Sequence, residues 1–345
     1  MTARRSIPRW GRRIGMIIGG CIVLLLLLLI GLMFLPISTS GLDSTPEPVA
    51  DYDAALARIE QMQASEPAAV RAECRTRLLN HGAPTEHVIV LLHGKTNCPA
   101  QFAVLSEVLY EQGYNVFVPR LPHHGLTNTM TDDLKNLTAE ELAAFGDAVV
   151  DSAVGLGDTI TVAGLSAGGV VSAWIAQHRS DVDRAVLIAP AFSTGRVPTA
   201  LAMPVMRLAL RIPDQQFWID AQRQEDWPGP PHNYKRQSSR GFAELARLGV
   251  AVRQAAEQAP PQTRAIVLVN NANDRAVDTT ITGWVIEAWE AQGGNVQVAE
   301  IPAELGLDHD MIDPLHPNEK VDVAYPILLD LIAPTVATHH RAGEQ

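Results

Sequence analysis

One serine of the chain lies in a sequence that could activate a hydroxyl group. Residues 164–168 read Gly-Leu-Ser-Ala-Gly, directly after the apolar run Thr159–Ala163 and directly before a run with helical periodicity. A serine at such a strand-to-helix turn needs small neighbours, which Gly164 and Gly168 supply, because the strained backbone crowds the flanking strand and helix. The N-terminus of the following helix would also favour negative charge beside the serine. We predict that Ser166 is a nucleophile rather than a structural turn residue.

A nucleophilic serine needs a base, and a histidine near the end of the chain is our candidate. Two of the eleven histidines lie in the loop after the last expected strand. His309 lies soon after that strand, whereas His316 precedes Pro317 near the start of the last expected helix. We predict that His309 is the base; its alternative role is that of a surface loop histidine.

The base in turn needs a carboxylate that orients it. The expected strand Arg264–Asn270 ends in polar residues, and Asp274 follows, where it could face the imidazole from the end of the strand. Asp278 is the competitor, but it precedes two threonines and could simply cap a helix. We predict that Asp274 is the acid.

Two backbone N–H groups should stabilise the oxyanion of an acyl-transfer reaction. Ala167 follows the nucleophile and offers one. The loop 93–96 after the first core strand reads His-Gly-Lys-Thr, and we assign the second donor to Lys95. Gly94 has no Cβ, so it allows a substrate to approach the backbone closely. We expect His93 to brace this loop rather than to act as the base.

The elements that would position these residues alternate between strand and helix, which predicts a parallel α/β sheet covered on both faces by helices. The expected strands are His87–Leu92, Asn115–Pro119, Thr159–Ala163, Arg184–Ala189, Arg264–Asn270 and Val296–Ile301. The expected helices are Tyr52–Ser65, Phe102–Gln112, Ala139–Ser152, Ala167–His178, Thr280–Gln292 and Lys320–Leu331.

One stretch, at about 193–258, breaks this alternation. It contains helical fragments that six prolines interrupt, and no convincing strand. An insertion of this length indicates a cap over the C-terminal ends of the strands, where sites in open α/β sheets lie. Its aromatic and methionine residues, such as Trp218 and Met206, either form the core of the cap or line an apolar pocket for an acyl or alcohol group.

The N-terminal segment predicts a membrane helix. Residues 14–36 carry no charge, and about 20 apolar residues match the thickness of a bilayer core. Five arginines within the basic tail 1–13 are the only charged residues before Asp43, so the positive-inside rule places the N-terminus in the cytoplasm. We predict an uncleaved single-pass signal anchor in the cell membrane, with the body extracytoplasmic; the alternative is a signal peptide cleaved near 37–41.

The remaining boundaries follow from composition. Residues 37–50 are rich in Ser, Thr, Gly and Pro and predict a linker, 51–335 the folded domain, and 336–345 a C-terminal tail. The chain has a net charge of −11, although its first 42 residues are purely basic. So acidic a body should repel nucleic acid and anionic lipid headgroups, and we expect neither as a partner.

Two of the three cysteines, Cys74 and Cys98, lie in the body, in a compartment that permits disulfides. Their loops could meet in a bridge, and the alternative is two unpaired buried thiols. Ligand-type residues gather at His123 and His124 and at 308–313, but neither HExxH nor a paired CxxC occurs. We expect no metal and no other cofactor.

Together these motifs resemble bacterial α/β-hydrolases of the carboxylesterase and monoacylglycerol-lipase type. The resemblance covers about residues 70–335 and rests on the segments 91–96, 119–125, 164–169, 273–277 and 308–309. The order Ser, Asp, His along the chain is that of the α/β-hydrolase fold. The resemblance implies the roles given above to Ser166, Asp274, His309, Lys95 and Ala167. Two departures are Lys95, where similar proteins often carry an aromatic or small apolar residue, and His123-His124-Gly125, which replaces the commoner proline/glycine–His–Gly.

These expectations combine into a membrane-anchored serine hydrolase that cleaves small-molecule or lipid carboxylic esters, including monoacylglycerol esters, through an acyl-enzyme. The same triad would serve an acyltransferase, a thioesterase or an amidase. A hydrolase fold with an inactive site would instead be a membrane-anchored binding protein.

Overall fold

The centre of the protein is one twisted sheet. The computed structural model describes residues 9–334, so residues 1–8 of the predicted basic tail and the predicted C-terminal tail 336–345 lie outside the described residues. Seven strands follow the spatial order β1-β3-β2-β4-β5-β8-β9, and only β1 is antiparallel to its neighbour. The predicted α/β class with a mostly parallel sheet is confirmed; the short strand β1 was missed. The strands are β1 Arg77–Leu79, β2 Thr85–Leu92, β3 Asn115–Val118, β4 Gly157–Leu165, β5 Arg184–Ile188, β8 Ala265–Asn271 and β9 Val296–Ile301.

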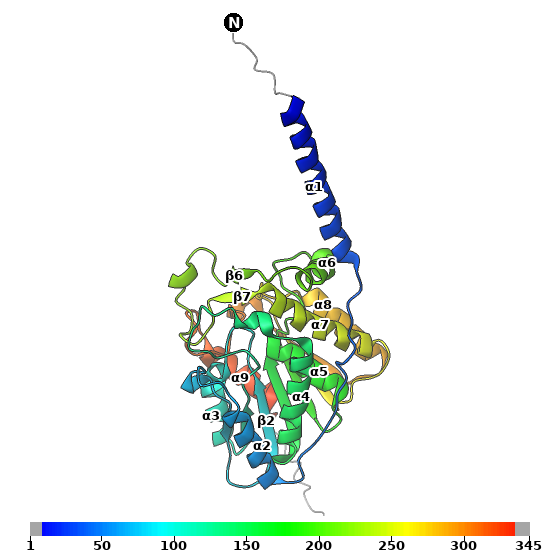
Figure 1. The fold of residues 1–345 in the computed structure, drawn as a ribbon. Coiled ribbons are helices and arrows are strands. Elements are labelled where there is room, and N and C mark those ends of the chain that lie inside the picture. The colour runs from blue at the N-terminus through cyan, green and yellow to red at the C-terminus, as the bar shows by residue number, and fades with distance from the viewer. Residues whose placement is uncertain (1–8, 335–345) are drawn as a thin grey trace, which may run out of the picture.

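Helices alternate with these strands and cover the sheet (Figure 1). Local signals set several helix starts: Thr138 and Glu141 form a reciprocal capping box at α4, and Asp51 caps α2. The longer helices are α1 Arg9–Phe34, α2 Tyr52–Ala64, α3 Ala103–Glu111, α4 Ala139–Ala153, α5 Ala167–His178, α6 Thr199–Ala209, α7 Ser239–Ala256, α8 Thr279–Ala291 and α9 Val321–Ile332.

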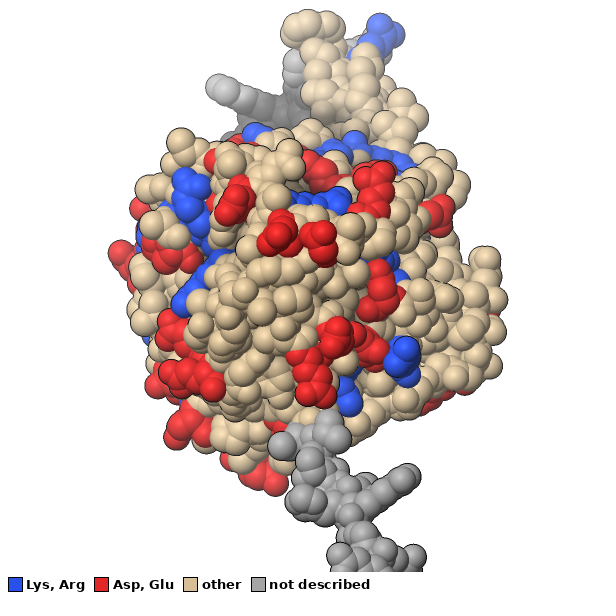
Figure 2. Space-filling model, turned by 90° about the horizontal axis from the view of Figure 1, so that it is seen from below, with Lys and Arg blue, Asp and Glu red and all other residues tan. Residues whose placement is uncertain are grey.

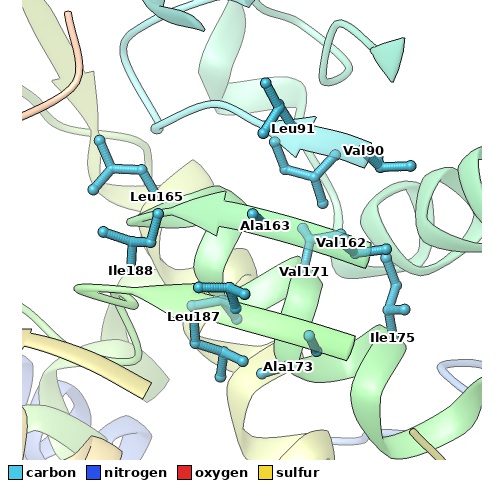
Figure 3. Packing of buried hydrophobic residues seen from close by; sticks show 14 of the residues in the cluster. Val90, Leu91, Val162, Ala163, Leu165, Val171, Ala173, Ile175, Leu187 and Ile188 are labelled. Atoms are coloured by element: carbon cyan, nitrogen blue, oxygen red, sulfur yellow. The ribbon is translucent and has the colours of Figure 1, made fainter. Parts of the chain in front are cut away.

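The core lies where the central strands meet the helix that follows the predicted nucleophile (Figure 3). Val90 of β2, Val162 of β4 and Val171 of α5 are all fully buried. Successive residues of β2, β3 and β5 are buried, as expected for strands covered on both faces. Because β2 and β4 run parallel with Leu92 opposite Gly164, their carboxyl ends reach the same edge of the sheet.

The cap predicted at 193–258 differs from expectation in one respect. It contains α6 and α7, but also two three-residue strands, β6 Gln216–Trp218 and β7 Arg236–Ser238, which pair antiparallel. The expectation of no strand was therefore wrong. Such short strands, separated by a long irregular connection, leave no alternating pattern in the sequence.

The N-terminal helix α1 projects away from the body, with its C-terminal end beside α6 of the cap (Figure 1). Its stretch Arg13–Phe34 has the length and hydropathy of a membrane span, and most of its side chains are exposed. Arg211 donates a hydrogen bond to the carbonyl of Pro36 at 2.6 Å, and Ile37 packs against buried Met206. Figure 2 shows that acidic side chains are spread over the opposite end of the body.

The segment 37–50, predicted as a linker, lies docked along the side of the body (Figure 1). Leu42 is buried, and its carbonyl accepts a hydrogen bond from the Trp174 indole at 2.7 Å. The N–H groups of Thr45 and Glu47 donate to the carboxylates of Asp147 and Asp151, at 2.7 and 3.0 Å. This segment therefore fixes the base of α1 relative to the domain.

The same two carboxylates hold a buried arginine. The Arg179 guanidinium is 1% exposed and contacts Asp147 at 2.9 Å, Asp151 at 2.7 Å and Asp181 at 2.6 Å. We predict that Arg179→Met lowers the free energy of unfolding by about 3–5 kcal/mol, because it leaves the buried carboxylate of Asp147 without its cation, whereas Asp151 keeps Arg58 at 3.5 Å. Urea denaturation of the full chain in detergent measures this.

Arg264→Met is the matched control. Its guanidinium is 79% exposed and contacts Asp183 at 3.2 Å, so we expect a change of about 0–1 kcal/mol. Equal effects of the two substitutions would contradict the structural role given to Arg179.

Candidate active site

The serine at the end of β4 has the backbone of a sharp turn. Ser166 has φ 58° and ψ −107°, in the left-handed half of conformational space. Its N–H donates to the Ile188 carbonyl at 2.9 Å, and its own carbonyl accepts from Ala191 N–H at 3.0 Å. These bonds from the neighbouring strand end hold the turn. Among the described residues the Ser166 hydroxyl has no hydrogen-bond partner, and it faces the cleft described below.

Glycine is required on both sides of this serine. A Cβ at Gly164 would lie 2.2 Å from the carbonyl oxygen of Gly168, and a Cβ at Gly168 would lie 2.0 Å from that of Leu92. Any side chain at either position would therefore separate β4, α5 and β2. The backbone of Gly94 also lies close, since a Cβ there would be 3.7 Å from the Ser166 Cβ.

The structure brings Asp274 and His309 together from the ends of β8 and β9. His309 Nδ1 lies 2.6 Å from Asp274 Oδ2, and the Asp274 side chain is 1% exposed. Asp274 Oδ1 accepts from Ala276 N–H at 2.7 Å, which fixes the carboxylate. With its Nδ1–H donated to Asp274, neutral His309 presents Nε2 as the proton acceptor.

Burial and neighbouring charges shift the pKa values of His309 and Asp274 in opposite directions. Burial lowers the pKa of His309, but the hydrogen bond that His309 donates to Asp274 and the charges of Asp274, Asp310 and Asp308 outweigh it, so this pKa lies above its ordinary value. Burial raises the pKa of Asp274, but the hydrogen bond and charge of His309 outweigh it, so the carboxyl remains ionised. The pair is therefore suited to stabilise an imidazolium.

The competing candidates for the acid and the base, Asp278 and His316, make other contacts. Asp278 caps α8, with Thr280 N–H at 2.9 Å, and its other oxygen accepts from the Thr199 hydroxyl at 2.6 Å. His316 lines the cleft, but its nearest carboxylate is Asp308, at 3.9 Å. Neither residue makes the contact that joins Asp274 and His309.

The two proposed oxyanion donors come from different segments, the loop after β2 and the start of α5. Among the described residues, neither Lys95 N–H nor Ala167 N–H donates a hydrogen bond. His93 lies buried behind this loop: its Nδ1 is 2.9 Å from the Gly94 carbonyl, and its Nε2 accepts from Leu121 N–H at 3.0 Å. Burial lowers the pKa of His93 well below its ordinary range, so it is neutral, as two such contacts require.

Sequence reasoning missed two further supports of this loop. The Gln101 side-chain oxygen accepts from Gly94 N–H at 2.8 Å, and His124 Nε2 hydrogen-bonds the Lys95 carbonyl. These contacts direct the peptide groups of Gly94 and Lys95. The signal for Gln101 was weak, a lone polar residue in the apolar stretch 99–105. His124 was noticed in the sequence without a role.

A buried polar network links the cap to the histidine loop. Asn97 Nδ2 donates to Asp310 at 3.1 Å and to Asp313 at 3.2 Å. His232 of the cap contacts the same Asp313 oxygen at 2.9 Å, and both side chains are almost fully buried. Desolvation and the neighbouring Asp313 raise the pKa of Asp310. The network joins the cap, the loop after β2 and the residue that follows His309.

Two cavities meet beneath the cap. A cleft of about 800 Å³ is lined by Gly94, Lys95, Ser166 and His309, among others. The second cavity, of about 570 Å³, is mainly apolar and lies between the cap helices and α8. Met206 and Phe217 line it, which is one of the two roles that the sequence left open for aromatic and methionine residues of the cap. Met206 also fulfils the other, because it is buried in the cap.

Cys74 and Cys98 form a disulfide, with Cα atoms 5.1 Å apart, that joins the segment before β1 to the loop after β2. The two cysteines are 24 positions apart in the sequence, and the loop that they close contains Gly94 and Lys95. Within residues 9–334, no group of three His, Cys, Asp or Glu side chains is arranged to hold a metal ion.

We predict that the pH profile reports the Asp274–His309 pair. His309 must be neutral to accept a proton, so kcat/KM for a neutral ester should fall as the pH drops through a His309 pKa that lies above its ordinary value. Asp274→Asn removes the carboxylate that favours the imidazolium, so its acidic limb should move to lower pH and its kcat should fall about 10⁴-fold.

Asp278→Asn is the matched control, because that carboxylate only caps α8 and contacts Thr199. Its pH profile should overlay that of the unmodified chain. An acidic limb that stays in place in Asp274→Asn would contradict the pairing.

The chain is similar to known hydrolases. Residues 89–322 match the alpha/beta hydrolase family. A thermostable monoacylglycerol lipase of Bacillus sp. (strain H-257) is 34% identical over 100 residues, which cover 27% of this chain and 36% of that protein. The match therefore spans about a third of that relative's length.

Two solved structures share the fold. One was reported for LipS and LipT, two metagenome-derived lipolytic enzymes; it has a TM-score of 0.56 at 17% identity and covers 76% of this chain and 98% of that chain. The other is a monoacylglycerol lipase of Paleococcus ferrophilus, with a TM-score of 0.53 at 16% identity, covering 76% of this chain and 100% of that chain. At these identities the likeness concerns the fold.

Proposed function

Because the chain belongs to the alpha/beta hydrolase family, we propose that it is a serine hydrolase that cleaves carboxylic esters through Ser166, Asp274 and His309. The observation that carries the proposal is the Asp274–His309 pair, at 2.6 Å, whose His309 lines the same cleft as a strained serine, with a hydroxyl that has no hydrogen-bond partner among residues 9–334. Catalytic hydrogen bonds between serine and histidine commonly tighten only when substrate binds.

The mechanism follows from these positions. His309 Nε2 takes the proton of the Ser166 hydroxyl as its oxygen attacks the ester carbonyl. The N–H groups of Ala167 and Lys95 hydrogen-bond the oxyanion, and Asp274 stabilises the imidazolium. His309 then protonates the departing alcohol, and water, deprotonated by His309, releases the acid and restores Ser166.

A lipid ester is the proposed substrate class. The apolar cavity beside the cleft suits a hydrocarbon chain, and α6, which lines it, lies next to the end of the membrane helix. Leu201 and Val205 of α6 and Phe217 of β6 expose apolar side chains in the same cap. The relative that is 34% identical over 100 residues is named as a monoacylglycerol lipase. A chain anchored by α1 would therefore meet its substrate at the bilayer.

The proposed reaction is tested with 4-nitrophenyl butyrate and a fluorophosphonate probe. Ser166→Ala should abolish labelling and lower kcat by at least about 10⁴-fold. Ser172→Ala, which alters a buried serine of α5 outside both cavities, should retain both. A folded chain that neither reacts with the probe nor cleaves the ester would contradict the proposal and favour a binding protein.

The same assay addresses the other acyl-transfer reactions. Thioester and amide analogues of the butyrate ester, and an added acceptor alcohol, would reveal a thioesterase, an amidase or an acyltransferase by their relative kcat/KM. We expect hydrolysis of the oxygen ester to be fastest, because a lipid ester is the proposed substrate.

We also propose that α1 is an uncleaved anchor with the catalytic domain outside the cytoplasm. Protease should degrade the domain in right-side-out membrane vesicles and not in inverted ones, because the basic tail favours the cytoplasmic side. The chain should also resist alkaline extraction from the membrane. Degradation confined to inverted vesicles would contradict the orientation, and release of a shortened chain would indicate a cleaved signal peptide.

A further inference from the structure

The two cavities meet at a polar boundary. The same five residues line both the catalytic cleft and the apolar cavity. These boundary residues are Lys95, Thr194, Arg196, Gln237 and Phe242. Four of the five are polar and two of these, Lys95 and Arg196, are basic, although the cavity beyond them is mainly apolar. A hydrocarbon chain that ran directly from Ser166 into the cavity would lie against these two basic side chains.

Lys95 is the buried member of this boundary. Its residue surface is 7% exposed, and its ammonium donates one hydrogen bond, to the Ser238 carbonyl at 2.9 Å. The ammonium lies 4.8 Å from the centre of the Phe242 ring. In the described part of the chain no carboxylate comes within 4.0 Å of it. An ammonium has three donors, so one carbonyl leaves its hydrogen-bonding capacity largely unused.

The charge of Lys95 is poorly compensated. Burial lowers its pKa to about 7, and Asp214, which acts in the opposite direction, only partly offsets this. Asp214 is itself engaged, since it accepts from the Ser238 hydroxyl at 2.7 Å and from Arg240 N–H at 2.9 Å. An anion at the boundary would therefore stabilise the charged form of Lys95.

Arg196 supplies a second cation at the same boundary. Its guanidinium donates to the Ile219 carbonyl at 2.9 Å, and among residues 9–334 it forms no ion pair. Unlike Lys95 it is exposed to solvent. The buried Lys95 side chain comes from the loop after β2, and the exposed Arg196 side chain comes from the start of the cap. Both thus line the boundary between the two cavities.

We propose that this boundary is an anion-binding subsite, and that the substrate is an amphiphile with an anionic group between its apolar chain and the scissile ester. The apolar chain would occupy the cavity under α6, the anion would bind Lys95 and Arg196, and the ester carbonyl would reach Ser166. The inference rests on the proposed ester hydrolysis and specifies its substrate class. Phosphodiester and carboxylate groups share the required chemistry.

Three synthetic acetate esters test this order of groups with the full chain in detergent. Each carries a dodecyl chain and an acetylated glycerol, joined by a phosphodiester, by a carboxylate-bearing linker or by a neutral ether of similar length. The readout is kcat/KM for acetate release. We expect at least one anionic ester to exceed the neutral one by about 10- to 100-fold, as for charge-assisted hydrogen bonds. Preference for neither anion would overturn the inference.

Variants assign the preference to the boundary. Lys95→Met and Arg196→Gln should each reduce the anionic-to-neutral ratio by about tenfold, and Arg196→Lys should retain most of it. Lys135→Met, which removes an exposed lysine paired with Asp132, should leave the ratio unchanged. Since Arg196 is exposed, its variants remain informative even if Lys95→Met fails to fold. Equal losses on charged and neutral esters would overturn the inference.

Hydrolysis of 4-nitrophenyl butyrate distinguishes failure of the proposed function from failure of the proposed anion subsite. Loss of that activity together with all acetate release would contradict the proposed function itself. Butyrate hydrolysis without any preference for an anionic amphiphile would contradict only the anion subsite.

Discussion

The left-handed backbone of Ser166 is the constraint on which the rest of the site depends. A non-glycine residue in this conformation costs about 1–3 kcal/mol, so surrounding contacts must hold it. Hydrogen bonds to Ile188 and Ala191 do so, and Gly164 and Gly168 are obligatory because a Cβ at either would meet backbone oxygen. The tight contact of Gly168 with Leu92 also brings the end of β2, and the loop that follows it, to the serine. The turn thus fixes both the position of Ser166 and its distance from the proposed oxyanion donors.

The parallel sheet supplies the remaining groups at the same edge. β2, β4, β8 and β9 run in one direction, so the segments after them meet above the sheet. Asp274 follows β8 and His309 follows β9, and strand pairing alone places these loops beside each other. The cap then covers the edge, and His232 ties it to Asp313 of the histidine loop. Because the docked segment 37–50 fixes α1 beside α6, the long apolar helix and the apolar cavity lie at one end of the molecule.

Much of this arrangement could be predicted from sequence, for local reasons. The core strands are short apolar runs, and Ser166, Asp274 and His309 each follow one of them, so their meeting required only the order of a parallel sheet. Asp278 was weighed correctly as a helix cap, because a carboxylate before two threonines has a local partner. The rest depends on contacts between distant segments. Gln101 accepts a hydrogen bond from Gly94 N–H, and Arg179 forms ion pairs with three carboxylates. Residues 45–47 donate hydrogen bonds to carboxylates of α4. No local sequence pattern indicates any of these contacts. The strands β6 and β7 were missed for the same reason.

We propose that Ser166, Ala167 and Lys95 surround one reacting carbonyl. A crystal structure of the chain after reaction with a fluorophosphonate tests it most directly, because the phosphonyl oxygen stands in for the oxyanion. We expect phosphorus bonded to the Ser166 oxygen, His309 Nε2 beside that oxygen, and the phosphonyl oxygen about 2.7–3.1 Å from the backbone nitrogens of Ala167 and Lys95. An adduct on another residue, or a phosphonyl oxygen that points away from both nitrogens, would contradict it.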